Sequence, residues 1–67
     1  MYKWKVMYEC TLLHEDDEWW EMEDEAYDEA KAYVETKKNE YEIDGAEYDE
    51  DAFCIIVVDE NGNEICY

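Results

Sequence analysis

An uninterrupted apolar segment near the end of the chain constrains the fold more than any other feature. Residues 52–58 read Ala-Phe-Cys-Ile-Ile-Val-Val, and strands favour β-branched and aromatic residues. Successive side chains of a strand point to opposite faces of a sheet, so a strand that is apolar at every position needs cover on both faces. The segment therefore predicts a central strand that is buried on both sides and has a neighbouring strand at each edge.

Residues 2–10 predict another strand, because their hydrophobicity alternates. One face carries Tyr2, Trp4, Val6, Tyr8 and Cys10. The other face carries Lys3, Lys5, Met7 and Glu9. A period of two over nine residues predicts a strand with one buried face.

A hairpin partner for strand 52–58 follows from Asn61-Gly62. This pair is a strong hairpin signal, because a type I′ turn needs positive φ at both central positions. With these two residues as the loop, Val58 pairs with Ile65 and Val57 with Cys66. That register predicts Cys66 on the face of Val57 and Cys54 on the opposite face, so the two thiols would not meet.

The middle of the chain is less clearly patterned. Residues 11–18 read as a connection, and residues 27–38 have apolar positions at the three- and four-residue spacing of a helix. Residues 18–23 fit either a short strand before that helix or part of one helix over 16–38, and periodicity does not decide between them. Residues 40–43 alternate and predict a short strand, Asp44-Gly45 marks a turn, and residues 46–51 form an acidic loop.

These elements predict one α+β domain over residues 1–67: an antiparallel sheet of four to five strands with one helix packed on one face. A chain of 67 residues has room for a single small core, so its stability is expected to be marginal. An apolar content of 48% is too high for a disordered acidic tail.

Net charge narrows the possible partners. The chain has 22 Asp and Glu residues, five Lys and no Arg, which gives a formal charge of −17. Such a charge opposes folding through self-repulsion and excludes nucleic acid and anionic membranes as direct partners. Solubility or adaptation to high salt is one explanation for it, and a partner with a strongly positive surface is another.

The carboxylates are unevenly distributed, which favours a binding face. Ten of the fifteen residues over 15–29 are acidic, eight more acids fall within 35–51, and four lie elsewhere. Interfaces are often anchored by Trp and Tyr beside such charges. The candidate partner-binding residues are therefore Asp16, Asp17, Glu18, Trp20, Glu21, Glu23, Asp24, Glu25, Asp28, Glu29, Glu47, Asp49, Glu50 and Asp51.

Residues for catalysis are scarce. His14 is the single histidine, the chain has no Ser, and the three cysteines are expected to be small reduced core residues. The acids of 44–51 could contribute calcium ligands but do not follow the EF-hand spacing, and paired Cys and His ligands for zinc are missing. We therefore expect no enzyme activity, no cofactor and no dedicated metal site. With no apolar span or leader pattern in the sequence, we expect a cytoplasmic protein of a bacterial host.

The acidic stretch 15–29 and the segment Ala26-Tyr-Asp-Glu-Ala-Lys-Ala-Tyr-Val34 resemble small phage-encoded DNA-mimic inhibitors. The closest likeness in size and layout is to anti-CRISPR proteins that block DNA binding by a Cas surveillance complex. The ending Ile-Ile-Val-Val-Asp-Glu-Asn-Gly-Asn-Glu-Ile65 is similar to the uracil-DNA glycosylase inhibitor. Both resemblances imply occupation of a basic DNA channel without turnover.

Two other functions are compatible with the sequence. One is an interaction module, such as an antitoxin or assembly factor, that binds through its apolar sheet face. The other is a small enzyme or metal-binding protein. The apolar strand at 52–58 could also be covered by a second copy, so either a monomer or a homodimer is expected.

Overall fold

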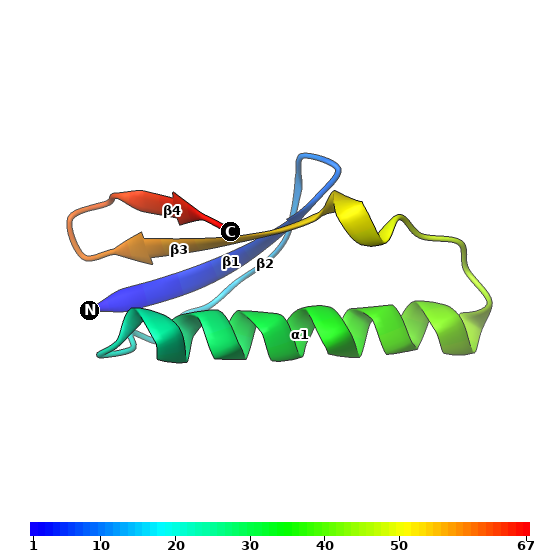
Figure 1. The fold of residues 1–67 in the computed structure, drawn as a ribbon, viewed down its shortest axis with the longest axis horizontal. Coiled ribbons are helices and arrows are strands. Elements are labelled where there is room, and N and C mark those ends of the chain that lie inside the picture. The colour runs from blue at the N-terminus through cyan, green and yellow to red at the C-terminus, as the bar shows by residue number, and fades with distance from the viewer.

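A computed structural model describes residues 1–67 and shows two layers, a four-stranded antiparallel sheet and one helix along one of its faces (Figure 1). The strand order is β2-β1-β3-β4. The elements are β1 (Tyr2–Tyr8), β2 (Thr11–Glu15), α1 (Glu23–Asp44), the 3-10 turn η1 (Glu50–Ala52), β3 (Phe53–Asp59) and β4 (Glu64–Cys66). The predicted α+β class, with four antiparallel strands and one helix that contacts them, is confirmed. No helix in the structure is both long enough and apolar enough to cross a membrane.

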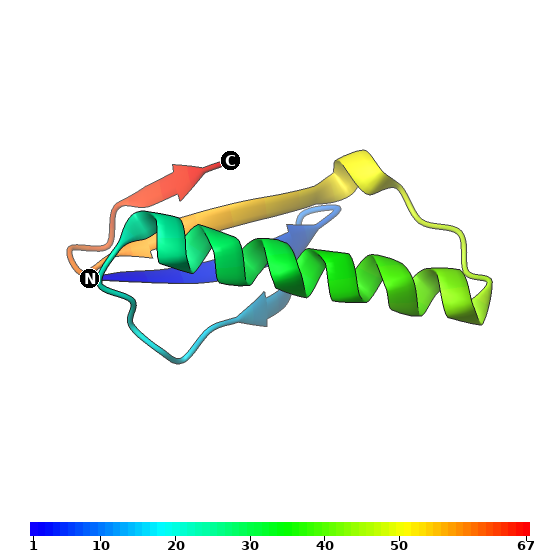
Figure 2. The same cartoon turned by 60° about the horizontal axis from the view of Figure 1, so that its bottom comes forward.

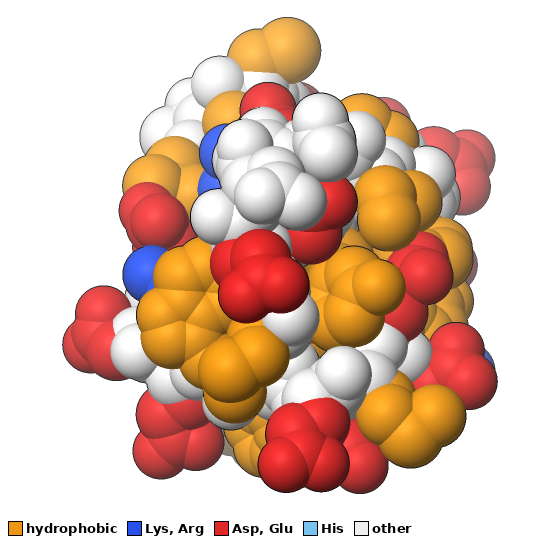
Figure 3. Space-filling view, turned by 90° about the vertical axis from the view of Figure 1, so that its left-hand side faces the viewer, with side chains coloured by type: hydrophobic (Ala, Val, Ile, Leu, Met, Phe, Trp, Pro, Cys, Tyr) orange, Lys and Arg blue, Asp and Glu red, His pale blue; other side chains and the backbone are white.

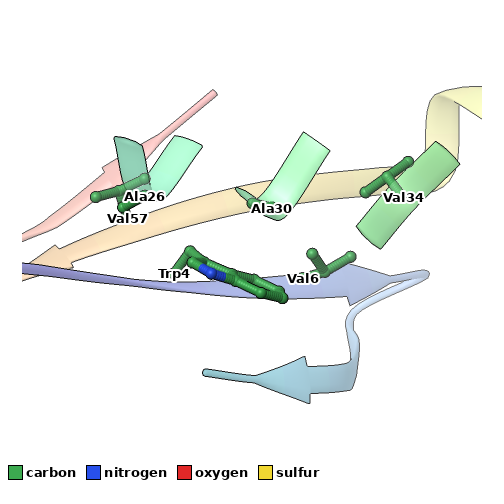
Figure 4. Close-up of a cluster of buried hydrophobic side chains, with 6 residues drawn as sticks. All are labelled: Trp4, Val6, Ala26, Ala30, Val34 and Val57. Atoms are coloured by element: carbon green, nitrogen blue, oxygen red, sulfur yellow. The ribbon is translucent and has the colours of Figure 1, made fainter. Parts of the chain in front are cut away.

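The core lies between α1 and the two central strands. Figure 2 shows the helix running across these strands, and Figure 4 shows the side chains between the layers. Six residues are buried: Trp4, Val6, Ala26, Ala30, Val34 and Val57. The helix contributes positions four residues apart, and its two alanines let the backbone approach the sheet closely. Only six of 67 residues are buried, so each contact in this core weighs heavily in the stability of the fold.

The face of β3 that points away from α1 is not covered, so the prediction that this strand is buried on both sides is wrong. Val57 is fully buried, whereas Cys54, Ile56 and Val58 are only partly buried. Their neighbours across β1 are Met7, Lys5 and Lys3. The reason is architectural, because the single helix provides one covering layer and the chain has no second one.

The segment predicted as a connection over 11–18 contains a strand, β2, which forms a hairpin with β1. Its two-residue turn consists of Glu9 (φ 49°) and Cys10 (φ 66°), between the paired residues Tyr8 and Thr11. Both turn residues occupy the left-handed region, which costs a non-glycine residue about 1–2 kcal/mol. Cys10 is therefore exposed in the turn rather than on the buried face of the first strand.

The helix is longer than predicted and begins at a different residue. α1 starts at Glu23, and residues 18–23 contribute only an isolated bridge between Trp20 and Tyr2. Both the short strand at 18–23 and a helix from 16 are therefore wrong, as is the strand at 40–43, which is helical. Gly45 (φ 71°) caps the helix C-terminus in the left-handed conformation that glycine favours there. Asp44-Gly45 is thus a helix cap.

The β3–β4 hairpin is shifted by one residue from the predicted register. Val58 pairs with Glu64, Val57 with Ile65 and Ile56 with Cys66. The Asp59 carboxylate accepts hydrogen bonds from the backbone N–H groups of Asn61 and Asn63, each at 2.9 Å. These bonds favour a three-residue loop over 60–62, in which Gly62 has a φ of 88°.

The new register changes the positions of the cysteines. Cys66 lies opposite Ile56 and therefore shares a face with Cys54. The prediction that they lie on opposite faces is wrong. All three cysteines are free thiols in the structure.

Candidate partner-binding surface

The outward side of α1 carries a row of carboxylates, which we call the acidic helix face. It consists of Asp24, Asp28, Glu35 and Glu42, at spacings of four and seven residues. All four are exposed, and the buried positions of the helix lie on its other side. Nine acids and three lysines occupy this helix in total, so its solvent side is strongly negative.

The segment before α1 adds carboxylates at one end of the molecule. Asp17, Glu18 and Glu21 are exposed there. Glu23, Asp24 and Glu25 form the first turn of the helix, where the positive end of the helix dipole stabilises negative charge. The sequence therefore keeps its densest acidic run at the end of α1 where that charge is best tolerated.

Asp16 and Trp20 play a structural part in this segment. The Trp20 indole Nε1 donates a hydrogen bond of 2.7 Å to Asp16 Oδ2, and Trp20 packs against the core. Asp16, Trp20 and Glu23 are the only candidate residues that are partly buried. Trp19, which was not among the candidates, is 44% exposed, with Lys3 Nζ lying 4.6 Å from its ring centroid.

The loop between α1 and η1, at the opposite end of the long axis, and η1 itself carry the other predicted acids. Glu47 and Asp49 are exposed in this loop, and Glu50 and Asp51 are exposed in η1, which lies back from that end (Figure 1). Asp49 caps η1 by accepting a hydrogen bond of 3.0 Å from the N–H of Asp51. Most candidate acids therefore lie either around the start of α1 or within residues 47–51, and the acidic helix face joins the two groups.

Aromatic contacts hold the distant end of α1 and this loop together. Tyr41 lies 5.4 Å from Tyr48 and 6.4 Å from Phe53 between ring centroids. Tyr48 also donates a hydrogen bond of 3.0 Å to Glu42. Desolvation and this hydrogen bond raise the pKa of Tyr48 to about 12. The cluster fixes the last turns of α1, which extend past the strands in Figure 1.

The side of the sheet that faces away from α1 is different in character, and we call it the outer sheet face. It consists of Lys3, Lys5, Met7, Leu12, Glu15, Cys54, Ile56, Val58, Glu64 and Cys66, as the strand registers place them. Its two lysines and two glutamates balance. Lys5 Nζ lies 2.8 Å from Glu64 Oε2, and that hydrogen bond raises the pKa of Lys5.

Shape and charge together approach those of a short polyanionic rod. The molecule measures 39 × 19 × 17 Å. Its net charge of −17 corresponds to one net charge per about 2.3 Å of the long axis, whereas duplex DNA carries one per ~1.7 Å. Figure 3 views the end that bears the β3–β4 loop and shows Asp and Glu around it, with hydrophobic side chains between them.

The remaining features of the structure are its potential metal ligands, its single histidine and one groove. No three His, Cys, Asp or Glu side chains come together in a way that could hold a metal ion. The His14 ring stacks on Tyr33, with ring centroids 4.9 Å apart, which gives it a packing role. A groove of about 370 Å³ on the outer sheet face is lined by residues that include Lys3, Trp19 and Val58.

No protein-family model matches the chain, and searches of curated proteins and of solved structures give no match either.

Proposed function

We propose that this protein is an inhibitor that acts by DNA mimicry, its acidic surface occupying the basic DNA-binding site of a partner protein. The partner favoured by the resemblance in size and layout is a CRISPR-Cas effector complex. The observation that carries the proposal is the separation of charge. Carboxylates line the acidic helix face and both ends of a 39 Å molecule, while the outer sheet face is electrically balanced.

The carboxylates of the acidic helix face form a row along the helix axis. Asp24 and Asp28 are four residues apart, which places them about 5–6 Å from each other, whereas the later members are seven residues apart, about 10.5 Å along the axis. The row is therefore sparser than the phosphates of one DNA strand, which follow each other at ~3.4 Å of axis. A groove of Lys and Arg that receives phosphates can pair with such a row. Attraction over the whole acidic surface would speed association and make it sensitive to salt.

The test compares two variants with equal net charge. The first neutralises the acidic helix face through Asp24→Asn, Asp28→Asn, Glu35→Gln and Glu42→Gln. The control removes four charges elsewhere through Glu9→Gln, Glu15→Gln, Glu60→Gln and Glu64→Gln. Binding to a purified Cas effector complex, in competition with its target duplex, is measured from about 0.05 M to 0.5 M NaCl.

We expect the wild-type protein to compete with the duplex and to bind more weakly as salt rises. The helix-face variant should lose about 100-fold or more in affinity, through the loss of several charge-assisted contacts, and the control variant far less. Equal losses in both variants would show that only net charge matters. Binding that does not respond to salt, or that leaves DNA bound, would refute the mimicry.

One observation favours a second candidate function. The apolar part of the outer sheet face could bind another protein, as in an antitoxin or assembly factor. In that case neutralising the acidic helix face would leave binding intact, and charged substitutions at Ile56 or Val58 would abolish it. In the Cas-complex assay, a wild-type chain that does not bind would favour this second function with another partner. Binding that is lost only through the changes at Ile56 or Val58 would assign the contact to the outer sheet face.

A further inference from the structure

The outer sheet face has an apolar centre that no part of the chain covers. Leu12 lies opposite Met7, and Met7 lies opposite Cys54, so three adjacent strands contribute to one apolar band. Ile56 and Val58 extend the band along β3. Leu12 is 47% exposed. A continuous apolar surface of this kind commonly marks a protein-protein contact.

The small core gives a reason for this face to be covered. The buried set has six members, and two of them are alanines that bury little area. Natural domains of this size often compensate for a small core by oligomerisation. Packing a second sheet about 10 Å away would bury the uncovered side of β3.

Charge identifies a second copy of this chain as the occupant. Two molecules of charge −17 repel each other wherever acidic surfaces meet, but the outer sheet face has as many lysines as glutamates. A two-fold contact must be self-complementary, because the same patch meets itself. Lys3 and Glu15 form no ion pair within the chain. Lys3 lies over the Trp19 ring and would have to move from it to pair with a carboxylate of the second copy.

We propose that two copies pack outer sheet face against outer sheet face about a two-fold axis. The acidic helix faces then point outward on opposite sides of the dimer and stay available. The strands have 7, 5, 7 and 3 residues, and at ~3.3 by ~4.8 Å for each residue they give a face of roughly 350 Å² per copy. The roughly 700 Å² of both copies is smaller than a stable specific interface and fits only a weak, transient contact, so the dimer should dissociate in the high micromolar range.

Salt gives this dimer a distinctive signature. Screening weakens the repulsion between two polyanions, so dimerisation should strengthen as salt rises. Binding to a basic partner through the acidic surface should weaken over the same range. Dimerisation and partner binding therefore respond to salt in opposite directions. The absence of one in an experiment would not imply the absence of the other.

The test is sedimentation equilibrium of the full chain in a reducing buffer, at about 0.05 M and 0.5 M NaCl. Leu12→Glu places a charge on the outer sheet face at an exposed position. Ile43→Glu is the matched control, because Ile43 is 84% exposed on α1 and the substitution adds the same charge. Circular dichroism of both variants confirms that they fold, and Met7→Lys, of opposite charge, serves as a second probe of the face.

The wild-type chain and Ile43→Glu should form a dimer that is stronger at the higher salt concentration. Leu12→Glu should weaken it by about tenfold or more, because each substitution occurs twice in a two-fold interface. A wild-type chain that stays monomeric at about 1 mM would overturn the proposal, as would a dimer that tolerates both Leu12→Glu and Met7→Lys. A monomer that loses binding to a different protein on Leu12→Glu would assign the face to that protein instead.

Discussion

The helix-covered side of the sheet and the outer sheet face are built from alternate residues of the same strands, yet one is buried and the other is accessible. Trp4, Val6 and Val57 point toward α1 and are buried, whereas Lys5, Ile56 and Val58 point the other way and stay accessible. The inner side holds the fold together. The outer side, and the acidic exterior of α1, contribute little packing within the chain, so their residues are available to define contacts with other molecules.

The same substitution at two adjacent residues of β3 tests the difference between the two sides of the sheet. Val57→Ala removes buried methyl groups and leaves a cavity, so we expect a loss of about 2–3 kcal/mol of unfolding free energy. Val58→Ala acts on the uncovered side and should cost under about 1 kcal/mol. Urea unfolding at low protein concentration measures both, and equal losses would mean that the outer side is packed as tightly as the inner.

Substitutions in the β1–β2 turn should raise the free energy of unfolding, by a somewhat smaller amount. Glu9 and Cys10 both have positive φ, so the double change Glu9→Asn and Cys10→Gly should stabilise the protein by about 1–2 kcal/mol. Glu9→Gln is the control for the loss of charge. A double variant that gains no more than this control would contradict the left-handed turn.

The acidic residues themselves divide into structural and surface groups, and a third pair of variants separates them. Asp16→Ala removes the acceptor of the Trp20 indole, so it should cost about 1 kcal/mol. Asp17→Ala changes an exposed carboxylate and should be within about 0.5 kcal/mol of wild type. Thermal unfolding of the two variants compares them, and a neutral Asp16→Ala would assign that residue to the binding surface alone.

The smallest effect is expected at the β3–β4 hairpin. Hydrogen bonds from the backbone and side chain of Asn63 lower the pKa of Asp59 below its ordinary value of 3.8. The carboxylate therefore contributes stability that is present above pH 3.8 and is lost as pH falls through the lowered pKa. An NMR titration should show Asp59 protonating below its ordinary value of 3.8, and the Asn63 amide should lose protection from hydrogen exchange in the same range. An Asp59 carboxyl that protonates at or above 3.8 would contradict this hydrogen-bonding arrangement.

The predictable parts of the fold are those with one clear periodicity. The alternation over 2–10 identifies β1, the apolar run at 52–58 identifies β3, and the acids over 15–29 and 35–51 are visible directly. The sequence does not predict β2, because the turn before it uses Glu and Cys in place of Asn and Gly. It predicts a strand at the end of α1 because Tyr41 and Ile43 alternate, whereas Tyr41 packs on Tyr48 and Phe53 at the end of a helix.

Only part of the candidate partner-binding surface can be predicted from the sequence. The membership of Glu35 and Glu42 in the acidic helix face depends on the rotational phase of a helix that reaches Asp44. The exposure of Trp19 in place of Trp20 depends on the hydrogen bond between Trp20 and Asp16. The register of the last hairpin depends on the carboxylate of Asp59, which reorganises the loop that Asn61-Gly62 alone would favour.

The long axis of the molecule sets a limit on what a mimic of this size could displace. At ~3.4 Å per base pair, 39 Å corresponds to about 11 base pairs, or roughly one helical turn of a duplex. A competing oligonucleotide shorter than this would leave part of the protein's footprint uncontested. If the channel of an effector holds several turns of DNA, this protein would block only one of them. Such an inhibitor would therefore have to bind the part of the channel that recognises DNA first.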